Sequence, residues 1–110
     1  NHPHTATSLD NLAVNHSAQG EYAKAEPLHE RALAIYEKAL GPEHPDTGFC
    51  LNNLGTLHAS QGNTEKAVSY LNRAVAIFEK TLGPDHPNTV ACRANLARIQ
   101  REGGDRGLTR

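Results

Sequence analysis

The chain contains nearly the same eight-residue phrase twice, as LGPEHPDT at residues 40–47 and as LGPDHPNT at residues 82–89. Its first residues, NHPHT, match the end of that phrase. Residues 5–46 align with residues 47–88 without a gap, and 20 of the 42 positions are identical. Self-similarity at a fixed period is typical of arrays of one supersecondary unit. The 42-residue repeat therefore constrains the fold more strongly than any other feature of the chain.

Each repeat is predicted to form two helices separated by a glycine. Gly20 and Gly62 lie where a helix C-cap is commonly found. Apolar residues recur at helical spacing on both sides of each glycine, which favours amphipathic helices over strands. The predicted helices cover residues 5–19 and 22–40 in the first repeat, and residues 47–61 and 64–82 in the second.

The repeated phrase combines a helix stop with a helix start. Gly41 can adopt the left-handed conformation that ends a helix, and Pro42 prevents the helix from continuing. Pro45 suits the first turn of the next helix, with His44 as a candidate N-cap. The second copy repeats this order with Gly83, Pro84, His86 and Pro87. Short turns are therefore expected to join successive helical hairpins.

Composition and charge exclude several classes of partner. The hydrophobic fraction is 37%, and alanine supplies much of it, which favours closely packed helices. The net charge is −1 and the isoelectric point is about 6.7, so no strong field attracts nucleic acid or anionic lipid. The apolar runs are too short to span a membrane, and no signal peptide is recognisable. We expect neither a nucleic-acid partner nor a membrane partner.

The two cysteines, Cys50 and Cys92, occupy equivalent positions of successive repeats. Such positions in stacked helices lie roughly 10 Å apart, one helix diameter. That separation exceeds the reach of a disulfide. Both are therefore interpreted as reduced thiols, and the expected location of the protein is the cytoplasm.

The first helices contain LDNLA and LNNLG, and the second helix of the first repeat is AEPLHERALAIYEKALG. Together with the repeated phrase and the 42-residue period, these segments resemble the tetratricopeptide repeats (TPR) of kinesin light chain type. Small residues match the close-packing positions of that family: Ala13, Gly55, Ala97, Ala25, Ala67, Ala32 and Ala74. The resemblance implies an all-α, right-handed superhelical solenoid of antiparallel helix hairpins. Its first helices would line a concave groove that binds extended peptides.

The predicted array occupies the whole chain, residues 1–110, with about two and a half repeats. The chain resembles a portion of a longer solenoid, because the family normally stacks more units. The expected divisions are repeat 1 at residues 5–46, repeat 2 at residues 47–88, the first helix of repeat 3 at residues 89–102, and a flexible tail at residues 103–110.

Asn11, Asn53 and Asn95 recur at one position of every first helix. The resemblance implies that they face the groove and bond to the backbone of a bound peptide. An amide side chain can both donate and accept, so it can bind a peptide unit of any sequence. The alternatives are that these amides bridge adjacent hairpins or only meet solvent.

Val14, Thr56 and Arg98 lie one helical turn beyond the asparagines and should share their face. They differ between repeats, as expected of residues that adjust specificity, although drift at exposed positions explains the difference equally well. Kinesin light chains often carry arginine near the end of the second helix, where this chain has Tyr36 and Phe78. These aromatics weaken the case for acidic cargo and are candidate core residues.

No catalytic or metal-binding pattern is recognisable in the sequence. The seven histidines form no close ligand pair on one helix, so no metal and no cofactor are expected. There is no phosphate-binding glycine loop, and neither cysteine has a neighbouring base in the sequence. The chain is predicted not to be an enzyme.

Two functions remain open at this stage. The first is a protein-interaction scaffold that binds an extended peptide or a partner helix in the groove. The alternative is a structural self-assembly element, in which the incomplete C-terminal repeat docks on another copy to give dimers or head-to-tail stacks. The sequence does not identify the partner.

Overall fold

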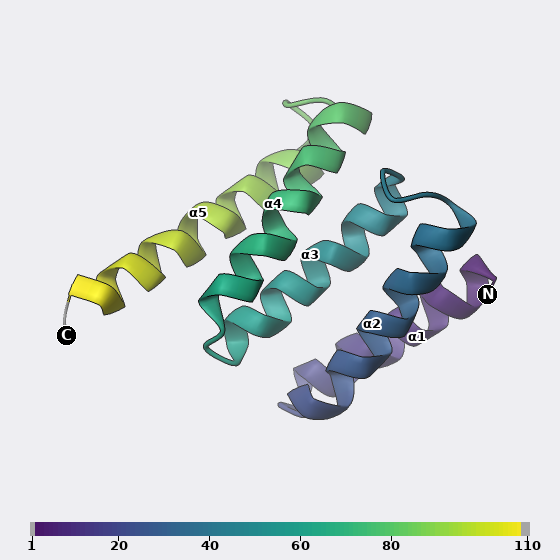
Figure 1. Cartoon of the computed structure of the whole chain (residues 1–110), viewed down its shortest axis with the longest axis horizontal. Helices are drawn as coiled ribbons and strands as arrows, with labels where there is room; N and C mark the ends of the chain where they lie inside the picture. Colours follow the sequence, from purple (N-terminus) through teal and green to yellow (C-terminus); the bar gives the residue numbers. More distant parts are fainter. Residues whose placement is uncertain (1, 109–110) are drawn as a thin grey trace.

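The computed structural model describes residues 2–108, with side chains described for residues 2–103. Within that range the chain forms helices and no strands (Figure 1). The all-α prediction is therefore confirmed. The helices are α1 (Pro3–Ala18), α2 (Tyr22–Ala39), α3 (Pro45–Ser60), α4 (Thr64–Thr81) and α5 (Pro87–Leu108).

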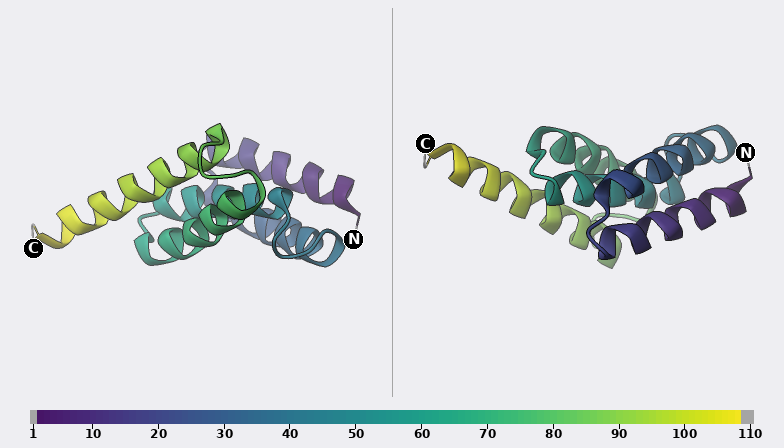
Figure 2. Two further views of the ribbon diagram at one scale, coloured as in Figure 1. Left: turned by 90° about the horizontal axis from the view of Figure 1, so that it is seen from above. Right: turned by 90° about the horizontal axis from the view of Figure 1, so that it is seen from below.

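The helices stack in chain order along one direction. The pairs α1/α2 and α3/α4 form hairpins, α3 packs on α2, and α5 packs on α4. The chain termini lie at opposite ends of the molecule, which measures 45 × 33 × 19 Å (Figure 1). Figure 2 shows α1 and α5 on one side of the second helices, α2 and α4. This arrangement is an all-α helical solenoid in which each hairpin contacts only its neighbours.

A histidine followed by a proline begins each first helix. The ring Nδ1 of each histidine accepts a hydrogen bond from the backbone N–H two residues later, at 3.1 Å in all three copies. The proline has no N–H to satisfy and its fixed φ suits the first turn. Each first helix therefore begins two residues earlier than predicted. The capping pairs are His2 with His4, His44 with Asp46, and His86 with Asn88.

Each second helix ends at a glycine with positive φ. Gly41 has φ of +102° and its N–H donates to the carbonyls of Tyr36 and Glu37, at 3.2 and 3.1 Å. Gly83 has φ of +92° in the second repeat. The left-handed backbone turns the chain toward the proline that follows, which confirms the predicted stop signal.

We expect Gly41→Ala to lower the free energy of unfolding by about 1–2 kcal/mol, because an L residue is strained at positive φ. A Cβ at this position would meet nothing within 4 Å, so the cost would come from the backbone alone. Urea unfolding followed by circular dichroism measures the difference. Asp85→Ala, an exposed residue of the equivalent turn, is the control. Equal stability of the two variants would contradict the prediction.

Small residues allow the helices of each hairpin to approach closely. A Cβ added to Gly55 on α3 would lie 2.6 Å from Cγ of Leu71 on α4. The equivalent Ala13 of the first hairpin is fully buried. The predicted close-packing positions are thus confirmed in both complete hairpins. The larger core side chains that are fully buried between the helices are Leu51, Leu54, Leu71 and Phe78.

The end of α5 corrects one boundary. The helix continues to Leu108, so residues 103–108 are helical where the sequence predicts a flexible tail. At Gly103, α5 passes so close to the start of α4 that an added Cβ would lie 2.7 Å from Cγ2 of Thr64. The absence of a side chain at residue 103 permits this close approach. Residues 109–110 of the predicted tail lie outside the described residues.

Candidate functional site

The three repeated asparagines lie on successive first helices. Asn11 is on α1, Asn53 on α3 and Asn95 on α5, and α3 contacts both of the other two helices. The side chain of Asn11 is exposed, and those of Asn53 and Asn95 are half-buried. Equivalent positions on adjacent parallel helices place the three amides at one level of the array. We call the surface formed by these three asparagines together with Phe49, Val14, Thr56 and Arg98 the first-helix face.

Asn53 bridges the first two hairpins. Its Nδ2 donates a hydrogen bond of 2.9 Å to Oδ2 of Asp10 on α1. The amide nitrogen of Asn53 therefore links adjacent hairpins, as the alternative interpretation of these residues expects. Within residues 2–103, the side-chain oxygen of Asn53 makes no hydrogen bond. The Asp10 contact fixes the orientation of that oxygen.

The three predicted specificity residues differ in what they offer a ligand. Val14 is 45% exposed and presents an apolar surface. The hydroxyl of Thr56 donates to the Asn53 carbonyl at 3.0 Å, so its proton is used within α3. Nη1 of Arg98 lies 3.6 Å from Oε1 of Glu102 on the same helix, and both side chains are about half exposed. An exposed pair of this kind is weak and can be exchanged for a ligand carboxylate.

Phe49 belongs to this surface, although the sequence pattern does not single it out. It lies one helical turn before Asn53, is 40% exposed, and its ring centroid lies 5.0 Å from that of Phe78 at 59°. At the equivalent place in the first hairpin, Thr7 and Tyr36 share a 2.8 Å hydrogen bond between their hydroxyls. The available signal in the sequence is the variation of this position from Thr to Phe to Ala between repeats.

Tyr36 and Phe78 are core residues. They are 5% and 1% exposed, so neither is available to hold cargo in place of an arginine. Burial raises the pKa of the Tyr36 phenol, and the hydrogen bond with Thr7 partly offsets that rise. These aromatics support the first-helix face from behind instead of contacting a ligand.

Two ion pairs on the side of the second helices link successive hairpins. Nη2 of Arg73 lies 2.8 Å from Oε2 of Glu37, and Lys80 pairs with Glu43. All of these groups are substantially exposed, so each pair contributes little to stability. Two ion pairs thus link the hairpins on the second-helix side, whereas the first-helix face presents amides, apolar side chains and the guanidinium of Arg98.

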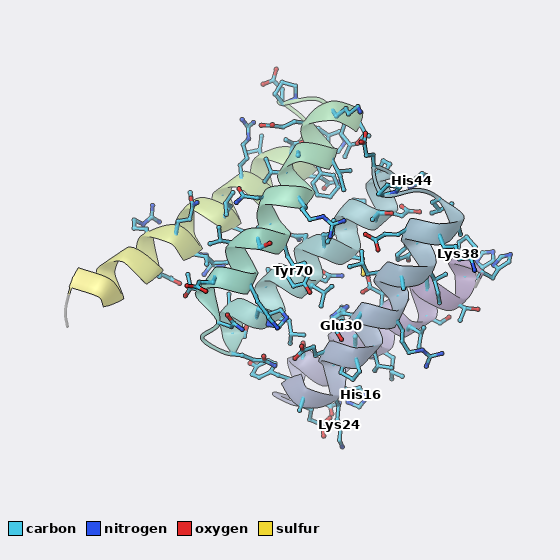
Figure 3. The ribbon with its side chains drawn as sticks, viewed as in Figure 1. His16, Lys24, Glu30, Lys38, His44 and Tyr70 are labelled. Carbon is cyan, nitrogen blue, oxygen red and sulfur yellow. The ribbon has the colours of Figure 1, made fainter. Side chains whose placement is uncertain are left out.

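Two histidines at repeat-equivalent positions have different partners. Nδ1 of His16 lies 2.9 Å from Oε1 of Glu21, and this bond, followed by that of Lys24, lowers the pKa of Glu21. In the second hairpin, the ring of His58 stacks on Tyr70 at 5.5 Å, and Asn63 replaces the glutamate. Figure 3 shows His16 and Lys24 at the turn between α1 and α2, and Tyr70 on α4.

Both cysteines are free and buried. Sγ of Cys50 donates to the carbonyl of His29 at 3.4 Å, and Sγ of Cys92 donates to Oδ1 of Asn52 at 3.4 Å. Burial raises the pKa of Cys92 to about 11. Burial, and then the negative charge of Asp10, raises the pKa of Cys50 still further. Neither thiol has the environment of a nucleophile, which needs a lowered pKa.

We expect both thiols of the folded chain to react with a disulfide reagent at least about 100-fold more slowly than an unfolded thiol at neutral pH, because the thiolate is the reactive form. The reaction is slower because a raised pKa leaves less of each thiol as thiolate at neutral pH. The native rate should still rise with pH above about pH 9, where the rate in denaturant has already reached its plateau. Stopped-flow absorbance with and without urea, in the presence of a chelator, measures both profiles. A native plateau near the ordinary thiol pKa of about 8.5 would contradict the expectation.

None of the helices in the described part of the chain is long and apolar enough to cross a membrane.

Comparison with known proteins agrees with the geometry. A family model described as tetratricopeptide repeat matches residues 4–80 and 58–107. Two solved structures carry the nearly identical TPR-like repeats of a proposed kinesin light chain of Podosopora anserina. The first is 33% identical over 94% of this chain with a TM-score of 0.83. The second, a variant of the same protein, is 32% identical over 96% of this chain with a TM-score of 0.83.

The chain spans about half the length of these solved chains, at 49% and 50%. No curated protein sequence gives a significant match. The repeat array is a protein-interaction fold and not an enzyme fold. The helical hairpins of the described residues, the family match and the structural neighbours lead to one assignment. The chain belongs to the tetratricopeptide repeat family and is of the kinesin light chain type.

Proposed function

We propose that this chain binds an extended peptide or a partner helix along its first-helix face, as a protein-interaction scaffold. The observation that carries the proposal is the recurrence of Asn11, Asn53 and Asn95 at one level of three successive helices, beside the exposed Phe49 and Val14. The fold itself is a general protein-interaction scaffold. The choice of this face and this mode of binding is our inference.

The spacing of the asparagines suits an extended ligand. Successive first helices lie roughly 10 Å apart, one helix diameter. An extended chain rises about 3.3 Å per residue, so the three amides would meet peptide groups about three residues apart. Each peptide unit offers one donor and one acceptor, which an amide side chain matches. Such contacts supply affinity without depending on the ligand sequence.

Selectivity would come from the neighbouring side chains. Phe49 and Val14 are 40% and 45% exposed, and they offer apolar surface on α3 and α1. Arg98 on α5 offers a positive charge whose only partner among the described residues is the exposed Glu102. We therefore expect preferred ligands to carry apolar residues opposite α1 and α3.

A peptide array with the purified chain tests the proposal. The variant Asn11→Ala, Asn53→Ala and Asn95→Ala is compared with Asn72→Ala, an exposed asparagine on α4. Each lost hydrogen bond is worth about 1 kcal/mol, so the triple variant should bind selected peptides roughly 100-fold more weakly. Asn72→Ala should bind as the wild type does.

Folding must be checked because Asn53 also bonds to Asp10. Equal far-ultraviolet circular dichroism at the assay temperature shows that a loss of binding is local. If no peptide is selected, or if all three proteins bind alike, the proposal is wrong.

The second candidate function is self-association, in which another copy of this chain binds to the exposed side of α5. Val90 on α5 is 50% exposed, although its equivalents Ala6 and Gly48 are buried. Gly48 lies against Ile77 and Phe78 of its own hairpin, whereas no second helix covers Val90 among the described residues. Leu12 on the opposite end of the stack is 46% exposed, although its equivalent Leu54 is fully buried.

Sedimentation across a wide concentration range distinguishes the two candidates. If the chain self-associates through Val90, the mass of the wild type should rise with concentration, whereas the variant Val90→Glu should stay a monomer. A wild type that is a monomer at all concentrations argues against assembly and leaves the peptide-binding proposal standing. A cytoplasmic location remains a prediction from the free thiols.

A further inference from the structure

Three metal-ligating side chains from three helices converge at the interface of the first two hairpins. They are Asp10 on α1, His29 on α2 and Cys50 on α3, and one ligand atom from each lies within 4.8 Å of the other two. His29 and Cys50 are buried, at 1% and 0% exposed. The sequence spacing does not reveal this group, because no two of its members lie on one helix.

Asp10 is the centre of the cluster. Its Oδ1 lies 2.5 Å from Nδ1 of His29 and 3.7 Å from Sγ of Cys50. Its other oxygen, Oδ2, accepts the hydrogen bond from Asn53 at 2.9 Å. Asn53 therefore holds the carboxylate in place and turns Oδ1 toward the imidazole and the thiol. Hydrogen bonds of this kind orient the ligands of metal sites.

We propose that Asp10, His29 and Cys50 bind a zinc ion, with Asn53 as the residue that orients the carboxylate. Imidazole nitrogen, thiolate sulfur and carboxylate oxygen are the donors that Zn²⁺ takes in proteins, at about 2.0–2.3 Å. Tetrahedral bonds of these lengths place ligand atoms roughly 3.3–3.7 Å apart. The Asp10–Cys50 distance already fits, and the His29–Asp10 distance would open by about 1 Å. The side chain of Asp10 is 13% exposed, which gives water access to the fourth position.

Charge and proton balance support this donor set. Without metal, Sγ of Cys50 is a hydrogen-bond donor to Oδ1 of Asp10 at 3.7 Å and to the carbonyl of His29 at 3.4 Å, so the thiol carries its proton. On binding, the thiol proton leaves to solvent, so that the thiolate and the Asp10 carboxylate together balance the dication. His29 binds through Nδ1 as neutral imidazole, so the proton of the hydrogen bond between Nδ1 and Oδ1 of Asp10 must leave that position, and the remaining ring proton lies on Nε2.

The next interface of the array lacks two of these three donors and serves as an internal control. The equivalents of Asp10, His29 and Cys50 are Asn52, Leu71 and Cys92. There the thiol of Cys92 bonds to the Asn52 amide oxygen, and the imidazole is replaced by a buried leucine. The two interfaces thus differ at two ligand positions on a common backbone. Zinc would join the first hairpin to the second and stabilise their stacking.

Titration of the reduced full chain with Co²⁺ tests the site, because a cobalt–thiolate bond gives a charge-transfer band in the near ultraviolet. We expect one equivalent of Co²⁺ to produce the band, and Zn²⁺ to displace it and raise Tm. Cys50→Ala should lose the band, and Cys92→Ala should keep it. His29→Leu and Asp10→Asn, which copy the second interface, should weaken Zn²⁺ binding by about 100-fold or more.

The variants that copy Leu71 and Asn52 are expected to remain folded, and circular dichroism checks this. A folded, reduced wild type that gives no charge-transfer band would overturn the proposal. A band lost in Cys92→Ala but kept in Cys50→Ala would also overturn it. So would a rise in Tm with Zn²⁺ that survives Cys50→Ala and disappears when His2 and His4 are replaced, because the ion would then bind at the N-terminus.

Discussion

Replacing Phe78 by alanine is expected to unfold most of the chain at room temperature. The ring is 1% exposed, and a Cβ on Gly48 of α3 would lie 2.9 Å from it. Truncating a buried phenylalanine costs about 3–5 kcal/mol. Small domains have about 5–15 kcal/mol of stability in total, and short repeat arrays are weak among them. Urea unfolding followed by circular dichroism should show a collapsed or absent folded baseline.

The matched control is Phe49→Ala, because Phe49 contacts Phe78 directly but is 40% exposed. We expect it to cost only roughly 1 kcal/mol and to leave a cooperative unfolding transition. Equal costs for the two substitutions would contradict the account, since they would mean that the second hairpin does not enclose Phe78.

The second large effect is expected for Asp10→Ala, measured in the presence of a chelator. The substitution removes the partner of His29 at 2.5 Å and of Asn53 at 2.9 Å. Hydrogen bonds to a charged group contribute about 1.5–3 kcal/mol, and an unpaired buried polar group costs about 1–3 kcal/mol. We expect a loss of about 3 kcal/mol in the free energy of unfolding. Urea unfolding of the variant and the wild type side by side measures it.

The control for this prediction is the double variant Asp10→Asn with His29→Leu. It reproduces the combination of Asn52 and Leu71 that the second interface already contains. Its stability should lie within about 1 kcal/mol of the wild type, because no buried imidazole is left without a partner. A cost for Asp10→Ala below about 0.5 kcal/mol would show that the network across the first interface contributes nothing.

Much of the fold could be predicted because the same local rules act in every repeat. Gly41 and Gly83 specify helix ends through their positive φ, and His44 with Pro45 specifies a helix start. The end of α5 was predicted wrongly, because residues 103–108 align with residues 61–66, where Gly62 follows the end of α3, and include three glycines of their own. At Gly103 the helix passes close to Thr64 at the start of α4, and no local pattern reveals this tertiary contact.

The candidate site was predictable only in part. The repeat period placed Asn11, Asn53 and Asn95 on successive first helices. It did not reveal that Asn53 bonds to Asp10, since the two residues lie 43 positions apart and in different hairpins. The cluster of Asp10, His29 and Cys50 was hidden for the same reason. The sequence signal that could have pointed to this cluster is a departure from the repeat, such as His29 where the second repeat has Leu71.

An NMR titration of the labelled chain with a peptide from the array shows directly which surface binds. We expect shifts in the side-chain amide signals of Asn11, Asn53 and Asn95, with those of Asn72 on α4 unchanged. Shifts confined to α2 and α4, with the three first-helix amides unaffected, would contradict this expectation.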